Sequence, residues 1–335
     1  MCAWCRNCWA TPRSPPHRST PWSRPTRCAR CTPIVTPERS RLERISERTS
    51  MSKSPDSDAP TGGAAESDLP DIPAPPELES HGPARIISMV NQKGGVGKTT
   101  STVSLGAALA GYGRRVLLVD FDPQGALSVA LGYNPNDMEL TVYNLITDPE
   151  CHLGDVLVPT DVPGLELLPS NIDLSAAEIQ LVSEVGREYA LQRALAPVID
   201  DYDIILIDCQ PSLGLLTVNA LTSSTDVIIP METEYFALRG VALLTDTINK
   251  VMGRLNPNLR ILGVLATMYD PRTLHSREVL ETVTKAFGDQ VFTTVINRTV
   301  KFPDAAVAGE PITTFASGST GAQAYRRLAR EVLAR

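Results

Sequence analysis

The stretch Lys93-Gly94-Gly95-Val96-Gly97-Lys98-Thr99-Thr100 constrains this chain more than any other part of its sequence. An apolar run at 86–90, typical of a buried strand, precedes it. A run of small residues at 101–110, typical of a helix packed closely on a sheet, follows it. Glycines let consecutive backbone N–H groups point inward, and a helix N-terminus adds partial positive charge. The sequence therefore predicts a phosphate-binding loop between a strand and a helix.

Two side chains of this loop have the chemistry that a nucleoside triphosphate requires. The Lys98 ammonium would reach the β- and γ-phosphates, and the Thr99 hydroxyl would be a ligand of Mg²⁺. The rest of the loop would bind phosphate through backbone amides. The residues predicted to contact the nucleotide are thus Lys93, Gly94, Gly95, Val96, Gly97, Lys98, Thr99 and Thr100.

Apolar strands alternate with helical periodicity along the rest of the chain. Further strands are predicted at 115–119, 165–168, 203–207, 226–230, 260–268 and 291–296. Helices are predicted near 172–182, 187–198, 213–223, 237–255, 273–287, 303–308 and 320–334, whereas the pattern between 131 and 165 is ambiguous. This alternation predicts an α/β fold with a mostly parallel, twisted sheet and helices on both faces.

Residues 1–50 differ in composition from the rest of the chain. They hold five of the seven cysteines, all three tryptophans and ten Arg without any Lys. Cys5 with Cys8 and Cys28 with Cys31 have the spacing of a zinc ribbon, but several prolines stand where a ribbon needs strands. A transit peptide is a second alternative. The segment is predicted to be disordered or not translated at all, with Met51 as an alternative start.

The remaining chain divides at residue 85. Residues 51–84 are rich in Pro, Ser and Asp and are predicted to form a disordered tail, while 85–335 form the folded domain. The net charge is −7 overall, and −14 without the basic first fifty residues. This acidity excludes a protein that coats nucleic acid with its whole surface, but it allows a local basic patch. No apolar run approaches the roughly 18 residues that a membrane-spanning helix needs, so no membrane partner is expected.

Acidic side chains follow two of the predicted strands. Asp122 comes after the second strand, and Asp208 ends the strand at 203–207. In a parallel sheet these positions share one edge with the phosphate loop, where ligands bind. Asp208 has the form of an acid that holds Mg²⁺ through water, and Asp122 is the candidate to orient an attacking water. Either acid alone could be a helix cap, but three such features at three strand ends favour an ATP-hydrolysing site with Lys98 and Asp122 as catalytic residues.

The loop resembles the deviant Walker A motif of the ParA/MinD group of P-loop ATPases. A usual P-loop has Gly at the position of Gln92, and this group instead carries the additional lysine, here Lys93. The resemblance implies that Lys93 is a third catalytic residue, which reaches across a dimer interface to the partner subunit's nucleotide. It covers residues 85–335 and implies the P-loop NTPase fold of the deviant Walker A type.

Three further stretches resemble ParA. Asp120-x-Asp122-Pro-Gln-Gly is similar to its Walker A′ motif, and 234–240 also fits. The segment 208–214 fits except at Gln210, where ParA proteins usually have Pro, which could alter the geometry beside the metal acid. The resemblance implies ATP and Mg²⁺ as cofactors, an ATP-induced sandwich homodimer and non-specific binding of double-stranded DNA. It also implies a ParB-type centromere-binding protein that stimulates hydrolysis, and a cytoplasmic, nucleoid-associated location.

The resemblance also implies sites in two loops after the strands at 260–268 and 291–296. Basic residues there are candidates to contact DNA phosphates, namely Arg272, Arg277, Arg298 and Lys301. Neighbouring residues of the same loops, Met268 and Asn297, are candidates to contact adenine.

Three other functions remain open at this point. A MinD-like ATPase on a membrane surface would need a basic amphipathic helix, whereas the apolar side of the 320–334 helix is predicted to dock on the domain. An iron protein of the nitrogenase type would use Cys151 and Cys209, but Cys209 has the character of a small buried hydrophobic residue. A scaffold with a vestigial site is disfavoured by the intact set of lysines and acids.

Overall fold

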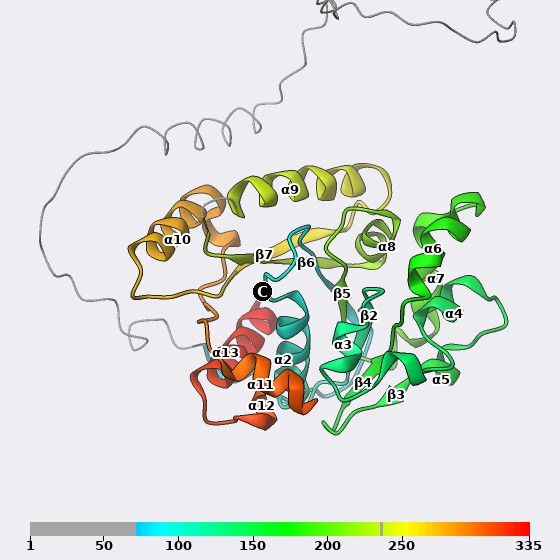
Figure 1. The fold of residues 1–335 in the computed structure, drawn as a ribbon, viewed down its shortest axis with the longest axis horizontal. Coiled ribbons are helices and arrows are strands. Elements are labelled where there is room, and N and C mark those ends of the chain that lie inside the picture. The colour runs from blue at the N-terminus through cyan, green and yellow to red at the C-terminus, as the bar shows by residue number, and fades with distance from the viewer. Residues whose placement is uncertain (1–71, 235–236) are drawn as a thin grey trace, which may run out of the picture. The chain divides into compact units, whose positions relative to one another are not determined.

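A seven-stranded sheet forms the centre of the domain (Figure 1). The computed structural model describes residues 72–234 and 237–335. The strands are β1 (Arg85–Met89), β2 (Val116–Phe121), β3 (Val158–Pro159), β4 (Leu165–Leu168), β5 (Ile204–Cys209), β6 (Asp226–Glu232) and β7 (Arg260–Thr267). Their order is β3-β4-β2-β5-β1-β6-β7, and only β3 runs antiparallel to its neighbour. The predicted mostly parallel sheet is confirmed.

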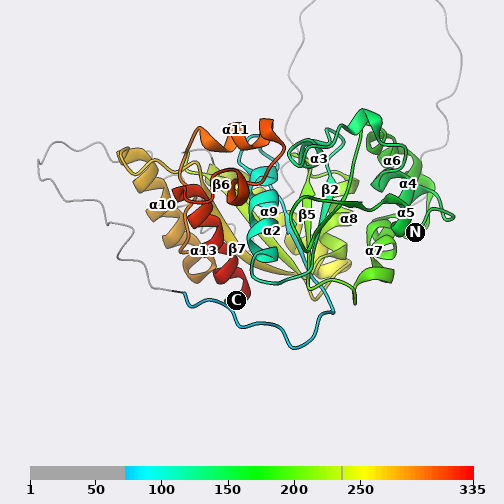
Figure 2. The same cartoon turned by 90° about the horizontal axis from the view of Figure 1, so that it is seen from below.

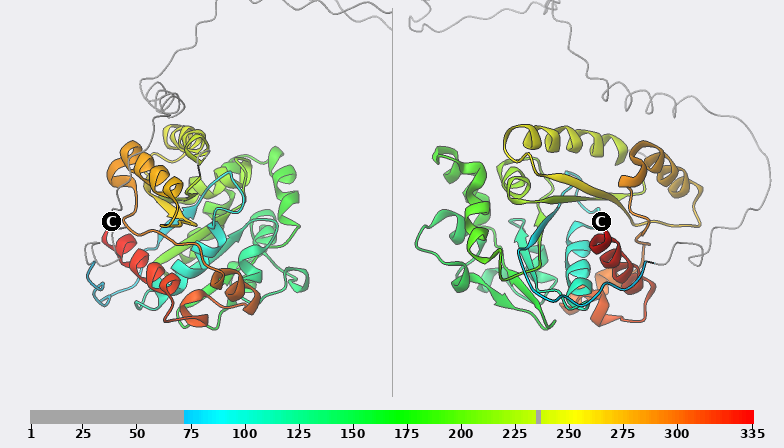
Figure 3. Two further views of the ribbon diagram at one scale, coloured as in Figure 1. Left: turned by 60° about the vertical axis from the view of Figure 1, so that its left-hand side comes forward. Right: turned by 180° about the vertical axis from the view of Figure 1, so that it is seen from behind.

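Helices cover both faces of this sheet (Figure 2). They are α2 (Lys98–Ala110), α3 (Ala126–Val129), α4 (Val142–Thr147), α5 (Leu153–Val156), α6 (Leu174–Gln180), α7 (Ala190–Leu195), α8 (Leu215–Ser223), α9 (Ala237–Arg254), α10 (Leu274–Phe287), α11 (Lys301–Ala308), α12 (Ile312–Phe315) and α13 (Thr320–Ala334). One apolar core joins the sheet to α2, α12 and α13, and the other joins it to α4 and α6–α10 (Figure 3). Strands buried on both faces have continuous apolar sequences, which is why β2, β5 and β6 were predictable.

The apolar side of α13 is buried against the domain. Tyr325 is 1% exposed, Leu328 and Val332 are fully buried, and the Tyr325 hydroxyl lies 3.0 Å from Ser101 Oγ on α2. The prediction that the 320–334 helix docks on the domain is therefore confirmed. None of the helices in the described part of the chain is both long and apolar enough to cross a membrane.

Two sequence expectations need correction. The strand predicted at 291–296 does not form; isolated bridges join Val291 to Val264 and Asn297 to Tyr269, because the segment touches the edge of β7 only at its ends. Residues 72–84, predicted as part of a disordered tail, have no helix or strand but bind the domain. The carbonyl oxygens of Ile72 and Pro76 accept hydrogen bonds from Arg330 and Arg114. Residues 1–71, including the candidate zinc cysteines, lie outside the described residues.

Helix α2 lies unusually close to the sheet, and Gly106 makes this possible. A Cβ atom at Gly106 would lie 2.6 Å from Leu118 Cδ2 on β2 and 3.4 Å from Leu165 Cδ1 on β4. Both leucines are buried, so they have little room to move. The run of small residues in the sequence thus indicates that α2 packs closely on the sheet, and this packing positions the phosphate loop.

We expect Gly106→Ala to destabilise the domain by about 1–3 kcal/mol, because the added methyl overpacks the contact between α2 and the sheet. The matched control is Gly253→Ala on α9, where an added Cβ meets nothing within 4 Å. That control should be neutral or stabilise by up to about 1 kcal/mol, as Ala favours helix. Urea unfolding of both variants tests this, and equal stabilities would show that α2 does not depend on Gly106.

Candidate nucleotide and metal site

The loop after β1 has the backbone geometry of an anion-binding site. Gly95 and Gly97 adopt φ angles of 75° and 81°, which other residues rarely adopt. Within the described residues, no backbone amide from Gly94 to Thr100 donates a hydrogen bond to the protein. The loop is held from the side, because Thr267 Oγ1 on β7 donates to the Val96 carbonyl at 2.8 Å. A fixed loop with unused donors at a helix N-terminus fits a phosphate chain.

Lys98 places its ammonium inside this loop. The residue is 7% exposed, and its Nζ donates to the Lys93 carbonyl at 3.3 Å. Lys98 forms no salt bridge within the part of the chain that the structure describes. Burial lowers the pKa of Lys98, although Asp208 partly opposes this shift. A buried amine without a paired carboxylate fits a ligand that brings negative charge.

Thr99 and Asp208, the two residues predicted to hold Mg²⁺, are hydrogen-bonded to each other. Thr99 Oγ1 donates to Asp208 Oδ2 at 2.6 Å, across the short distance between the start of α2 and the end of β5. Burial and, to a smaller extent, the nearby Asp120 carboxylate raise the pKa of Asp208 to about 8. A hydroxyl and a carboxylate are the hard oxygen ligands that Mg²⁺ prefers. The residues therefore fit the cation, which would be held by Thr99, by Asp208 through water and by the phosphates.

Asp120 also contributes to this site, although no separate function was predicted for it. It pairs in register with Asp208 on the adjacent strand and is fully buried. Its Oδ2 accepts from the Ser128 amide and hydroxyl at 2.9 and 2.7 Å, and its Oδ1 accepts from the Asp122 amide at 3.3 Å. Burial raises the pKa of Asp120 to about 7. Asp120 thus fixes the start of the loop that carries Asp122.

Asp122 lies at the same sheet edge as the loop, as predicted. Its negative charge raises the pKa values of both Lys98 and Asp208, so the three side chains are close enough to interact electrostatically. Asp122 Oδ1 accepts from the Gln124 amide at 2.9 Å, so its carboxylate is oriented by its own turn. The geometry brings Lys98, Thr99, Asp122 and Asp208 together.

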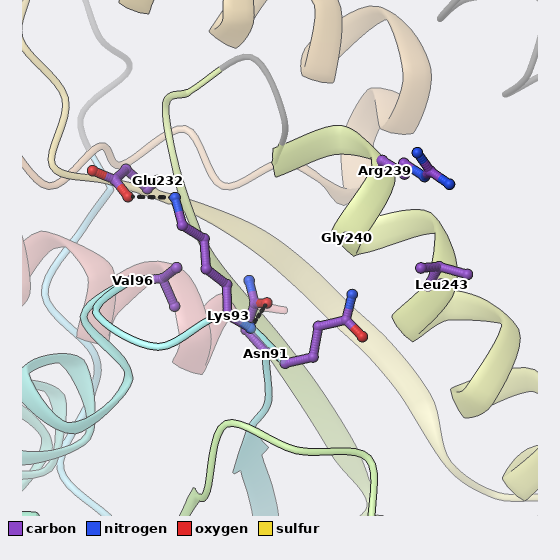
Figure 4. Close-up of a pocket in the computed structure, with 8 residues that line it drawn as sticks. Asn91, Lys93, Val96, Glu232, Arg239, Gly240 and Leu243 are labelled. Carbon is purple, nitrogen blue, oxygen red and sulfur yellow. Dashed lines mark hydrogen bonds and ion pairs between the residues drawn. The ribbon is translucent and has the colours of Figure 1, made fainter.

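The side chain of Lys93 extends from the loop toward Glu232 at the end of β6 (Figure 4). Its Nζ donates to Glu232 at 3.0 Å and to Glu234 at 2.9 Å, and its side chain is 45% exposed. These hydrogen bonds, above all the one that Lys93 donates to Glu234, raise the pKa of Lys93. Glu232 also accepts from Arg298 at 3.1 Å. The sequence did not predict these pairs, although the acids directly follow an apolar strand as Asp208 does.

Two cavities flank the loop. One, of about 410 Å³, separates it from α9 and is lined by Asn91, Gln92, Lys93, Val96, Glu232, Arg239, Gly240 and Leu243 (Figure 4). The other, of about 200 Å³, begins at Thr99 and continues between α3 and the segment from Phe302 to Ile312. The sequence analysis missed the second cavity, because the small residues of α11 carry no motif.

The adenine candidates lie on paired segments beside the loop. Met268 follows Thr267, which binds the loop, and has a φ angle of 52°, a rare value for a residue other than glycine. The Tyr269 amide donates to the Ile296 carbonyl at 3.1 Å, which brings Met268 and Asn297 onto neighbouring turns.

The four DNA candidates differ in accessibility. Arg272 and Lys301 are exposed, but Arg272 forms two hydrogen bonds of 2.9 Å with Asp270. Arg298 binds Glu232, and the Nε atom of Arg277 is buried without a hydrogen-bond partner among the described residues. Arg272 and Lys301 are therefore the stronger candidates. Of the cysteines, Cys209 is 1% exposed, which confirms its predicted burial, and Cys151 is partly exposed.

The raised pKa of Asp208 makes stability depend on pH. An unfolded Asp has a pKa of about 3.9, so the folded protein binds this proton more tightly, and the associated stability is lost progressively as the pH rises from about 4 to about 8. We expect Asp208→Asn to raise the melting temperature of the ligand-free protein most at pH 9, less at pH 6 and little at pH 4. The exposed Asp289→Asn is the control. A stabilisation that does not depend on pH would show that Asp208 ionises normally.

The comparisons with known proteins agree with this geometry. A model of an AAA domain family matches residues 84–261, more than half of the chain. An uncharacterized protein of Mycobacterium tuberculosis is 63% identical over 79% of this chain and 83% of its own length. The chromosome-partitioning ATPase Soj of Treponema pallidum is 49% identical over 75% of this chain and 98% of its own length.

A solved structure shows the same fold with ligands bound. It is described as cobyrinic acid a,c-diamide synthase of Mycobacterium smegmatis with ADP and magnesium, and a second structure of it holds an ATP analogue and magnesium. The ADP-bound structure is 44% identical, covers 75% of this chain and 94% of its own, and has a TM-score of 0.67. Together with the additional lysine, the three strand-end features and the Soj relative, this shows that the chain belongs to the ParA/Soj-type ATPases, the deviant Walker A branch of the P-loop ATPases.

Proposed function

We propose that this ATPase partitions chromosomal or plasmid DNA. In this proposal, ATP and Mg²⁺ induce a sandwich homodimer that binds double-stranded DNA without sequence preference on the nucleoid. A ParB-type centromere-binding protein stimulates hydrolysis and so releases the dimer from DNA.

The position of the two lysines carries the proposal. Lys98 is buried inside its own loop, whereas Lys93 extends from the same loop, is 45% exposed and binds two carboxylates. One lysine therefore serves the nucleotide of its own subunit, and the other is available to a second subunit. A site completed by a partner explains why hydrolysis would be slow in the monomer.

The chain's residues divide the work of hydrolysis between them. The loop amides and Lys98 bind and neutralise the phosphates, and the ammonium of Lys93 adds charge from the second subunit. Asp122 accepts a hydrogen bond from water and orients it toward the γ-phosphate. Bound Mg²⁺ supplies further charge neutralisation at the phosphates.

The names of two relatives suggest different uses of ATP. Soj of Treponema pallidum is a chromosome-partitioning ATPase, whereas the Mycobacterium smegmatis protein is named for the synthesis of an amide. An amide synthase would consume ATP only with an acid substrate and a nitrogen donor, independently of DNA. We favour partitioning because the exposed Lys93 has no role in a site that one subunit completes.

DNA binding in the presence of ATP, ADP or no nucleotide tests the proposed function. We expect wild type to bind a random-sequence duplex only with ATP. Lys93→Ala should bind ATP with unchanged affinity, remain a monomer by sizing and fail to bind DNA. If it dimerises like wild type, Lys93 does not act across subunits. Binding to anionic liposomes rather than DNA would favour the MinD-like alternative.

We propose that Arg272 and Lys301 contact DNA phosphates. Both are exposed and follow adjacent segments that pair through Tyr269 and Asn297, so one surface can hold them both. The ion pair with Asp270 reduces the charge that Arg272 offers, and it is exposed to solvent and therefore weak. Phosphate would compete with this carboxylate for the guanidinium.

Salt titrations of DNA binding test this patch. In dimers that Asp122→Ala keeps in the ATP state, Arg272→Glu or Lys301→Glu should weaken DNA binding several-fold and lower the log–log salt slope by about one per lost contact. Asp270→Asn should instead strengthen binding, because it frees Arg272. Arg193→Glu, on exposed α7, is the control. Identical curves for all variants would exclude this surface.

A further inference from the structure

The outward side of α6 and of the segments just before and after it carries apolar side chains, where a surface helix normally carries polar ones. Ile172 is 60% exposed, Ile179 78%, Val182 60% and Val185 95%. We call these four side chains the α6 surface. The opposite side of the same segment is buried through Leu174, Ala177 and Leu181. Helix α6 lies at the rim of the domain beside α4 (Figure 1). Its apolar outer side is therefore not explained by the core.

The charge around the α6 surface restricts what can bind there. Residues 171–186 contain Asp173, Glu178 and Glu184. Two arginines that follow this segment reach it: Arg187 donates to the Val182 carbonyl and pairs with Glu188, and Arg193 donates to the Gly186 carbonyl. Carboxylates still outnumber guanidinium groups here, which disfavours negatively charged DNA and anionic lipid headgroups. A protein segment with apolar side chains flanked by Lys or Arg complements both the exposed apolar area and the carboxylates.

Helix α6 also contacts the loop that follows the metal acid. Glu178 Oε1 accepts from Gln210 Nε2 at 3.2 Å and from the Leu216 amide at 3.4 Å. A Cβ at Gly214 would lie 2.4 Å from this oxygen, so only glycine admits the carboxylate at that point. Gln210 stands two residues after Asp208. The carboxylate thus holds both ends of the loop 210–216.

The metal acid connects the same loop to the phosphate loop. Asp208, two residues before Gln210, accepts a hydrogen bond from Thr99 Oγ1 at 2.6 Å. The contacts from α6 therefore run through Glu178 and Gln210 to the strand end that carries Asp208, and from Asp208 to the start of α2. This set of contacts is a route by which binding at α6 could reach the phosphate and metal site.

We propose that the α6 surface is the docking site of the protein that stimulates ATP hydrolysis. This protein presents an apolar segment flanked by Lys or Arg, and the Glu178–Gln210 contact transmits its binding to the loop after Asp208. The proposal rests on the proposed function, because it assigns a surface to the ParB-type partner. It also gives a role to Gln210, at which this chain departs from the usual ParA sequence.

The first experiment measures ATP turnover of the full chain with increasing amounts of the ParB-type protein from the same genome. Ile179→Glu combined with Val182→Glu should leave basal turnover and ATP affinity unchanged and raise the half-stimulating partner concentration at least tenfold. Val307→Glu, at a side chain that is 91% exposed on α11, is the matched control and should behave as wild type. Asp173→Lys combined with Glu184→Lys should also weaken stimulation, because it reverses the charge that attracts the partner.

The second experiment separates docking from transmission. Glu178→Ala should bind the partner with unchanged affinity by calorimetry but lose most of the stimulation, whereas Glu178→Gln keeps an acceptor oxygen and should retain it. Stimulation of the Ile179→Glu/Val182→Glu variant at wild-type partner concentrations would overturn the assignment of the surface while leaving the proposed function intact. A wild-type protein that the partner does not stimulate would contradict the proposed function, and this inference with it.

Discussion

The electrostatics of the candidate site depend on the burial of three ionisable side chains at one edge of the sheet. Lys98, Asp120 and Asp208 are each less than 10% exposed, on α2, β2 and β5. Desolvation lowers the pKa of the lysine and raises the pKa of both acids, so each group is moved toward its neutral form. Bound phosphate and a divalent cation would favour the charged forms again, because phosphate carries the charge opposite to Lys98 and the cation carries the charge opposite to the two acids. The fold therefore keeps unfavourable electrostatics in place for its ligands to relieve.

The features that the sequence predicted are those in which local pattern and tertiary structure agree. The phosphate loop, the buried strands around Leu118 and Ile205 and the docked final helix each follow from apolar periodicity or glycine spacing. Asp122 and Asp208 were predictable because parallel strands bring their carboxyl ends to one edge. The segment 291–296 has the apolar composition of a strand, but strand formation depends on pairing along its length, and its sequence does not report that it meets β7 only at two points.

Pairing between distant charges was the part of the site that the sequence could not predict. Lys93 and Glu232 are 139 residues apart, and Arg298 is a further 66 residues along the chain. The sequence showed each as a charge beside a candidate loop, but not that the two oxygens of Glu232 are divided between them. Arg272 and Asp270 are two residues apart in sequence, yet either could have pointed to solvent. Such side-chain choices depend on packing and desolvation rather than on composition.

The Glu232 carboxylate binds both Lys93 and Arg298, and so connects the nucleotide loop with the candidate DNA loop. One carboxylate oxygen binds the lysine that would serve a second subunit, and the other binds an arginine in the candidate DNA loop. If Lys93 moved to the nucleotide of a second subunit, as the proposed function requires, Glu232 would be left to Arg298 alone. The nucleotide loop and the candidate DNA loop are thus joined through a single carboxylate, and this link requires no movement of the sheet.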